Sequence, residues 1–417
     1  MSTLSGLDRT EVPVPEPDLT PAEMIARAES MKPKLRSLQD DFERRGSYSE
    51  EVHQEFQANG FYRILQPRRF GGYEFDVTTF WKVMVKIAEG DPGTGWCLAL
   101  ASHHALVIGS GFTEQAQREI FGPNGDFRAP HRVPPMGSAV PTEGGYIVNG
   151  TWDYCSGMPY STHFMGNATV SGGDDAEQHP SNIVVVIPRG QVTMLDDWGG
   201  GRLLGLQSSG SNSVVVENVF VPTHWTCDWE GMRAAGPNVG TELHPNPMYL
   251  GVLRSVYHAG LAVSVVGAAR AAVDELEELI TTKETHFPPR VPRYTHPDHQ
   301  RAFGLASVLA DSAEALIYRV GDVYMERCQR WADTGQPFDQ EDDVQLYTIL
   351  QQAGQLAARA VDEVFSIGSS SAVKRGQRLQ RYYRDAAMYR SHISAQYLGT
   401  ATERAKLHFG LPHSLPS

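Results

Sequence analysis

The stretch Gln380–Gly399, QRYYRDAAMYRSHISAQYLG, carries the most informative pattern in the chain. It contains no Pro, and no Gly before its last residue, so it predicts a helix of about 19 residues. Helical spacing then places five side chains on one side of that helix, namely Asp385, Met388, Tyr389, His392 and Gln396. Met and Tyr at such spacing usually belong to a core, and so does a lone His. The pattern alone therefore leaves a catalytic and a structural role open for His392.

The composition of the 417 residues is that of a globular protein, with 41% hydrophobic and 20% charged residues. The net charge of −13 argues against a nucleic-acid partner. Cys97, Cys155, Cys227 and Cys328 form no CxxC pair, so the sequence predicts neither a metal site nor a disulfide framework. A polar, acidic N-terminal stretch and the absence of an 18-residue apolar run predict a cytoplasmic protein without a membrane span.

The periodicity divides the chain into a flexible arm at residues 1–20 and three further parts. Residues 21–125 are predicted to be helical, because Thr20-Pro21 and Ser49 are typical helix starts. Residues 126–235 change to a period of two, which predicts a β domain with strands at 145–154, 183–187 and 213–221. Residues 245–410 return to helical periodicity and predict a four-helix bundle with helices at 250–283, 299–334, 340–367 and 380–407.

One long connection in the bundle has two interpretations. The basic, Pro-rich segment Glu284–Pro297 is too long for a tight hairpin. It is predicted to be a surface excursion, with the edge of a pocket as the alternative.

The segment Leu379–Tyr389, LQRYYRDAAMY, resembles the last long helix of the acyl-CoA dehydrogenase superfamily. The resemblance covers about residues 25–410 and implies an α+β, mostly α fold: an N-terminal helical domain, a middle β domain and a C-terminal four-helix bundle. In the dehydrogenases a glutamate base follows this motif, but its position falls on Ile393 here. The preceding residue, His392, is similar to the catalytic histidine of the two-component, reduced-flavin-dependent monooxygenases that share this fold.

A second segment, Asn149–Gly157 with the sequence NGTWDYCSG, resembles the strand that passes the flavin in that superfamily. The resemblance implies that Ser156 approaches flavin N5, that Gly157 allows close approach of the backbone, and that Trp152 packs against the ring. The alternative is an ordinary strand-end turn, in which Ser-Gly is common.

The resemblance implies further cofactor contacts. Gly210 and Ser211 keep the family's Gly-rich pattern, although Gln207-Ser208-Ser209 stands where relatives often have Arg-Gly-Thr. The loop Ile367–Ser371, IGSSS, is implied to reach the flavin of a neighbouring subunit through Gly368, Ser369 and Ser370, which predicts a homotetramer. Arg301 is either a flavin-phosphate ligand or a solvated surface residue.

The segment Asp91–His104, DPGTGWCLALASHH, resembles a helix that lines the substrate pocket of the phenol-hydroxylating members. His104 would then orient the substrate, and a histidine on an amphipathic helix is the alternative. His103 is predicted to face away from it, because adjacent helical residues diverge by about 100°.

Together these patterns predict the oxygenase component of a two-component flavin monooxygenase. No GxGxxG follows a strand, so reduced flavin, FMN or as a second choice FAD, would come from a separate reductase. With O2 it would form a C4a-hydroperoxyflavin and hydroxylate an aromatic, phenolic substrate. Ser156 is assigned to flavin N5, and His392 to accepting the substrate hydroxyl proton near pH about 6.5. The alternatives are a relative that oxidises nitrogen or sulfur, an acyl-CoA dehydrogenase, and a flavin- or partner-binding protein without turnover.

Overall fold

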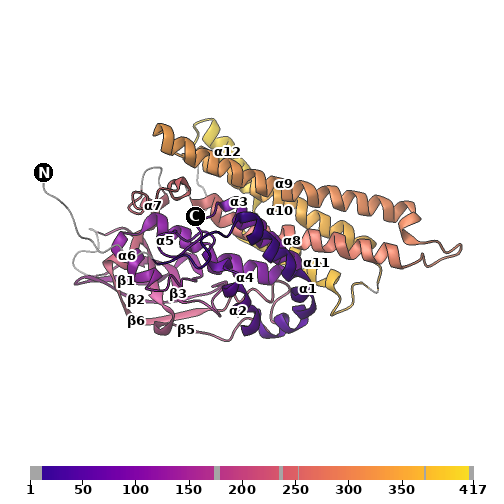
Figure 1. The fold of residues 1–417 in the computed structure, drawn as a ribbon, viewed down its shortest axis with the longest axis horizontal. Helices are drawn as coiled ribbons and strands as arrows, with labels where there is room; N and C mark the ends of the chain where they lie inside the picture. Colours follow the sequence, from indigo (N-terminus) through magenta and orange to yellow (C-terminus); the bar gives the residue numbers. More distant parts are fainter. Residues whose placement is uncertain (1–11, 173–178, 234–237, 252, 371, 413–417) are drawn as a thin grey trace.

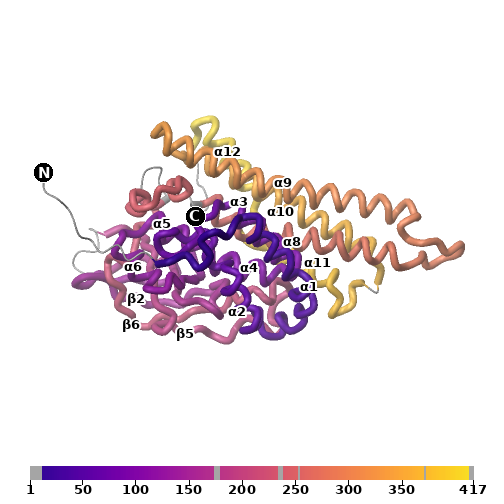
Figure 2. The backbone as a smooth tube through the Cα atoms, in the orientation of Figure 1, coloured from indigo at the N-terminus to yellow at the C-terminus, as the bar shows by residue number. Residues whose placement is uncertain are grey.

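The computed structural model describes residues 12–172, 179–233, 238–251, 253–370 and 372–412. Helices of the first part lie against a β-sheet, and long helices of the last part extend beyond both (Figure 1). The path of the backbone shows how far these long helices project from the rest of the chain (Figure 2). The predicted α+β, mostly α fold is confirmed.

The first part contains six α-helices within the described residues. The predicted starts are confirmed, since Thr20 forms a capping box with Glu23 ahead of Pro21 and Ser49 caps the second helix. The third and fourth helices are separated at Asp91, whose side chain caps the helix that follows. The six helices are α1 Pro21–Arg45, α2 Glu50–Ala58, α3 Val77–Gly90, α4 Pro92–Ser102, α5 His104–Gly111 and α6 Glu114–Phe121.

The segment predicted as an arm lies partly outside the described residues, which begin at Val12. Residues 12–20 lie against the first helical part: Val12 donates to the carbonyl of Arg69 at 3.2 Å, and Glu16 pairs with Arg27 at 2.6 Å.

The middle part forms one sheet of seven strands in the described residues, ordered β5-β6-β2-β1-β3-β4-β7. All neighbouring strands are antiparallel except β1 and β3. The three predicted strands correspond to β2, β4 and β6. The prediction missed β1 because three prolines and a glycine interrupt its pattern. The strands are β1 His131–Thr142, β2 Gly145–Trp152, β3 His163–Val170, β4 Asn182–Pro188, β5 Thr193–Met194, β6 Val214–Pro222 and β7 Thr226–Asp228.

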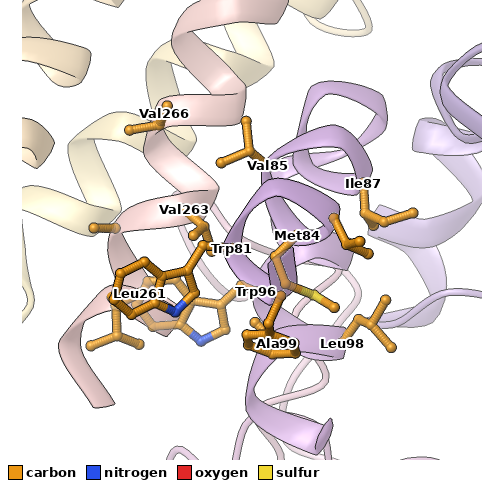
Figure 3. Packing of buried hydrophobic residues seen from close by; sticks show 14 of the residues in the cluster. Trp81, Met84, Val85, Ile87, Trp96, Leu98, Ala99, Leu261, Val263 and Val266 are labelled. Atoms are coloured by element: carbon orange, nitrogen blue, oxygen red, sulfur yellow. The ribbon is translucent and has the colours of Figure 1, made fainter. Parts of the chain in front are cut away.

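The last part is built around α8, which packs against α3, α4, α9, α10 and α11. Figure 3 shows Trp81 and Met84 of α3 and Trp96 of α4 beside Leu261 and Val263 of α8. By length and composition Arg254–Thr282 could cross a membrane, but 83% of its apolar window is buried, as in the core helix of a soluble protein. The remaining helices are α7 Trp229–Arg233, α8 Leu253–Thr282, α9 Pro297–Thr334, α10 Gln340–Ile367, α11 Arg378–Ser391 and α12 Tyr397–His408.

The long helix predicted over Gln380–Gly399 is wrong, because the chain breaks at His392. Helix α11 ends at Ser391, a 3-10 turn spans Ile393–Ala395, and α12 begins at Tyr397. The extended backbone of His392 (φ −71°, ψ 143°) brings its Nδ1 within 3.1 Å of the Ser394 amide. This side-chain cap offers the backbone an alternative to the helical hydrogen bond, so it overrides helix propensity.

The Pro-rich connection between α8 and α9 is a surface segment. Residues 284–297 are largely exposed, and the Phe287 side chain is 83% exposed. A bridge between Glu284 and Pro292 closes its base. This agrees with the surface excursion and not with the alternative of a pocket edge.

Candidate active site

A cavity of about 460 Å³ lies where α4, α5, β1, α8 and the turn after α11 meet. This volume is in the range of small-molecule and cofactor sites. Aromatic side chains from distant parts of the chain contribute to its wall, and no Asp or Glu belongs to the described lining. The aromatic members are Trp96, Tyr154, Trp198, Trp229 and Tyr257.

The cavity brings together four of the predicted site residues. His104 opens α5, Ser156 follows β2, Ser211 precedes β6, and His392 follows α11, and all four line the cavity. The remaining seven predicted residues do not line it, namely Trp152, Gly157, Gly210, Arg301, Gly368, Ser369 and Ser370.

Ser156 belongs to a short row of buried hydroxyls on one wall. Its Oγ accepts a hydrogen bond from Trp96 Nε1 at 2.9 Å and lies 2.6 Å from Ser211 Oγ. Ser211 Oγ lies 2.7 Å from Ser209 Oγ. Trp96 donates its N–H to Ser156, so Ser156 can donate to Ser211 and Ser211 to Ser209. The hydroxyl hydrogen of Ser209, at the other end of the row, is then available to a ligand.

Two of the predicted glycines position this wall instead of lining it. Gly157 has φ +92°, and a Cβ there would lie 2.9 Å from Ala101 N and 3.0 Å from Cys97 O, so the turn docks directly on α4. Gly210 has φ +57°, and its N–H donates to Gly46 O at 2.8 Å, which ties the serine loop to the end of α1.

Trp152 lies inside the sheet and not at the cavity. It is fully buried, donates from Nε1 to Asn167 O at 2.9 Å and packs edge-on against Phe164 with ring centroids 5.3 Å apart. The expected packing against a flavin is therefore not its role within this chain. It stabilises the sheet behind Ser156.

The remaining predicted cofactor residues lie away from this chain's own cavity. The Arg301 side chain is 72% exposed and pairs with Asp298 at 2.7 Å. Gly368 caps α10, and Ser369 has φ +72°. Ser371 lies outside the described residues. A contact of this loop with the flavin of a neighbouring subunit stays a prediction.

The hydrogen bonds of His392 determine which of its nitrogens carries the proton. Nδ1 accepts from the Ser394 N–H at 3.1 Å, so in the neutral ring the proton sits on Nε2. Burial first, and then the nearby Arg132 cation, lower the pKa of His392 to about 4. The imidazole is therefore a neutral hydrogen-bond donor at neutral pH, which contradicts the expected proton acceptor with an ordinary pKa.

The imidazole of His104 holds its proton on the other nitrogen from that of His392. Its Nδ1 must donate to the carbonyl of Ala129, 2.7 Å away, so Nε2 carries the lone pair. That Nε2 is buried and has no hydrogen-bond partner among the described residues. Burial first, followed by the neighbouring His103 and His131, holds the pKa of His104 well below its ordinary value. His104 is thus a cavity-lining residue whose Nε2 is a buried hydrogen-bond acceptor.

His103 was expected to face away from the substrate pocket and does not line the cavity, but its ring packs against that of His104. Their ring centroids are 4.1 Å apart, because α4 ends at Ser102 and a new helix begins at His104. The 100° rule applies only within a continuous helix.

Two further polar residues, His131 and Tyr257, line the cavity beside His104 and were not predicted from the sequence. His131 of β1 bonds through Nε2 to Asn167 Oδ1 at 2.8 Å and through Nδ1 to the Tyr257 hydroxyl at 2.5 Å. Since Asn167 Oδ1 only accepts, Nε2 donates and Nδ1 accepts from Tyr257. These residues come from β1, β3 and α8, so no local motif signals them.

A buried carboxylate holds the serine loop from the opposite side. Asp385 of α11 accepts from the Leu206 N–H at 2.6 Å, and Leu206 lines the cavity. Burial first, and then repulsion from Asp91, raise the pKa of Asp385 to about 7. The helix face predicted from the sequence therefore includes Asp385, which anchors the serine loop, as well as residues that line the cavity.

Comparisons with known proteins agree with this geometry. The model of the acyl-CoA dehydrogenase N-terminal domain matches residues 26–124, and that of the C-terminal domain matches residues 259–397. The oxygenase subunit HsaA of a flavin-dependent monooxygenase from Rhodococcus jostii (strain RHA1) is 28% identical over 396 residues, or 93% of this chain and 97% of the relative.

Solved structures extend the match to the whole fold. The 3-HSA hydroxylase from Rhodococcus sp. RHA1 superposes with a TM-score of 0.84 at 26% identity, covering 94% of this chain and 98% of the other. XiaF from Streptomyces sp., solved with FADH2 and glycerol, has a TM-score of 0.84 at 21% identity, covering 95% and 97%. The second likeness establishes the fold alone.

Proposed function

The chain belongs to the acyl-CoA dehydrogenase family, and we propose that it belongs to the branch of that family that uses reduced flavin and O2 to oxygenate a substrate instead of oxidising an acyl-CoA. It is the oxygenase component of a two-component flavin-dependent monooxygenase that hydroxylates an aromatic, phenolic substrate. One oxygen atom of O2 enters the product and the other leaves as water, with two electrons from reduced flavin delivered by a separate reductase. The observation that carries the proposal is a cavity with no described carboxylate in its lining, in which two of the histidines, His104 and His392, hold the imidazole proton on opposite nitrogens.

The residues of the wall fit a reduced flavin, FMN in the first place and FAD as the second choice. The row Ser156, Ser211 and Ser209 supplies uncharged hydroxyls for a ring nitrogen, and Trp96 supports the row from behind. Bound reduced flavin supplies the electrons that activate O2. The apolar lining around it keeps water away from the reacting atoms.

The two histidines take different roles in this proposal. His104 carries its lone pair on Nε2 and is proposed to orient the substrate by accepting a hydrogen bond from its hydroxyl, without taking the proton itself. His392 presents Nε2–H and donates a hydrogen bond to oxygen that gains negative charge. These two roles replace the prediction that His392 accepts the proton of the substrate hydroxyl.

The acyl-CoA dehydrogenase reaction requires a carboxylate base in this cavity. Ile393 occupies the expected position, and it has no titratable group. Asp385, in the preceding helix, is bound to Leu206 N and does not line the cavity. Both observations favour oxygenation over dehydrogenation.

The protein is further proposed to act in the cytoplasm as a homotetramer. Three apolar side chains near the cavity and along α12 are exposed: Ile393 (62%), Leu398 (79%) and Phe409 (72%). A second copy of the chain would remove them from water. Sedimentation of the purified protein tests this, and an active monomer would contradict it.

The function is tested by turnover with a separate flavin reductase, a nicotinamide donor and air. We expect 18O from 18O2 in a hydroxylated phenol, with reduced FMN and reduced FAD compared side by side. Indoles, thiophenes and amines serve as competing substrates, so oxygen transfer to nitrogen or sulfur would redirect the substrate class. Oxidation of an acyl-CoA without O2 consumption would replace the proposal by the dehydrogenase reaction.

A further inference from the structure

We infer that Gln351 of α10 is a positioning residue for His392: it holds the turn whose backbone amide decides which imidazole nitrogen carries the proton. The inference rests on the proposed role of His392 as a donor. Gln351 does not line the cavity, and no motif points to it.

The contact that carries the inference is a buried hydrogen bond to the turn after α11. Gln351 is 2% exposed, and its Nε2 donates to the carbonyl of Ser394 at 2.7 Å. The Tyr347 hydroxyl approaches the same carbonyl at 3.5 Å, and Gln355 Nε2 donates to Ala395 O at 3.2 Å. These carbonyls lie where the break between α11 and α12 removes helical partners, so α10 supplies replacements.

The same residue, Ser394, links the glutamine to the histidine. Its carbonyl is held by Gln351, and its N–H donates to His392 Nδ1 at 3.1 Å. Anchoring the carbonyl restricts rotation of Ser394, so its N–H stays directed at the ring. As long as that bond persists, Nδ1 is occupied and the proton of the neutral ring stays on Nε2.

One face of α10 is adapted to this turn. Tyr347, Gln351, Gly354 and Gln355 are spaced by four, three and one residues, so they share a side of the helix. A Cβ at Gly354 would lie 2.0 Å from the hydroxyl of Tyr389, three residues before His392. The glycine therefore lets the end of α11 lie close against α10.

Among the described residues, only the donor end of the Gln351 amide makes a hydrogen bond. Gln351 Oε1 is buried and has no hydrogen-bond partner among the described residues. Leaving a buried acceptor unpaired costs free energy, and an apolar residue would avoid that cost. The glutamine is therefore explained by what its Nε2 holds.

The acid-base behaviour of His392 supplies a sensitive readout. Arg132 of β1 is the charged group that acts on its pKa. The Ser394 N–H favours the neutral ring, so loss of this bond raises the pKa of His392. Other titratable side chains line the same cavity, namely His104, His131, Tyr154, Arg254, Tyr257 and His258.

The test compares Gln351→Met with Gln355→Met in the full-length enzyme. Gln351→Met removes the donor at nearly constant volume, and Gln355→Met removes a donor one residue farther from His392. We expect the first variant to lower product formed per flavin oxidised by about tenfold, as small misplacements of reacting groups do. We expect the second to retain it within about twofold, because Ser394 remains held. Gln351→Glu provides an isosteric second variant if the methionine variant does not fold.

A measurement without flavin or substrate separates this inference from the proposed function. Ring 15N shifts of labelled histidine, with His392 assigned from a His392→Gln sample, report the tautomer and its titration. In wild type we expect Nε2–H, and in Gln351→Met mixed tautomers and a midpoint above that of wild type. An unchanged tautomer and midpoint in Gln351→Met, or equal changes in Gln355→Met, would overturn the inference even if turnover is lost.

Discussion

The regions around His104 and His392 hold the same side chain in opposite ways. At His104 a backbone carbonyl accepts from Nδ1, whereas at His392 a backbone amide donates to Nδ1. One cavity residue therefore has a lone pair on Nε2 and the other a hydrogen. The comparison teaches that a histidine's role is decided by the backbone atom behind it, because the residue type is shared although His392 is the less buried of the two.

The largest expected effect is the loss of the acceptor at His104. We expect His104→Asn to lower product formation by about 10²-fold, since a small misplacement of a reacting group costs that much. Flavin oxidation should continue and release hydrogen peroxide, which a peroxide assay measures beside product.

His103 provides the matched control for that substitution. It is equally buried and adjacent, but it does not line the cavity. His103→Asn should keep product per flavin oxidised within about threefold, whatever it does to stability. Equal loss of product in both variants would mean that the region acts through packing and not through the His104 lone pair.

The second effect tests donation at His392. His392→Gln can keep an N–H donor, whereas His392→Leu removes it at similar size. We expect the glutamine variant to form roughly tenfold more product per flavin oxidised than the leucine variant, because a hydrogen bond to a charged group is worth about 1.5–3 kcal/mol. Product and peroxide yields at pH 7.5 measure the ratio. If the two variants are equally impaired and added imidazole rescues both, His392 acts as a base and the comparison with His104 fails.

The sequence predicted the family, the fold and four residues that line the cavity, namely His104, Ser156, Ser211 and His392. His104, Ser156 and His392 belong to local segments whose order of residues is informative by itself. It did not predict the break at His392, because the competing contact lies in the turn and not in helix propensity. Nor did it predict His131 with Tyr257, which are 126 positions apart and meet only after β1 packs beside α8.

A third effect separates the two regions by acid sensitivity. The buried cluster at His104 includes His103 and His131, whose pKa values burial lowers to about 3 and about 4. Unfolding restores an ordinary pKa near about 6.5, so the unfolded chain binds more protons below that pH. Stability contributed by these neutral rings is therefore present above about pH 6.5 and is lost as pH falls toward 4.

The measurement is the urea midpoint between pH 7 and pH 4.5 for wild type and for His103→Gln, which keeps polarity without titrating in this range. We expect the wild-type midpoint to fall more steeply, by several tenths of a molar, because a shift of one pKa unit corresponds to about 1.4 kcal/mol. Parallel slopes for the two proteins would mean that His103 is protonated in the fold without penalty.

The smallest expected effect concerns Asp385, in the helix that precedes His392. Its contribution to stability decreases as pH rises, in contrast to that of the buried histidines. Burial and Asp91 raise its pKa to about 7, whereas an unfolded Asp titrates near about 3.9. The folded chain thus binds the extra proton between these values, and the stability from the protonated carboxyl is lost as pH rises through about 7. Asp385→Asn keeps an oxygen for the Leu206 N–H and cannot ionise. We expect this variant to match wild type near pH 4 and to exceed its melting temperature by about 2–4 °C at pH 8.5, as measured by calorimetry. A variant that is less stable at pH 8.5 would mean that the ionised carboxylate is the form the serine loop requires, and that both sides of the cavity lose stability in acid for the same reason.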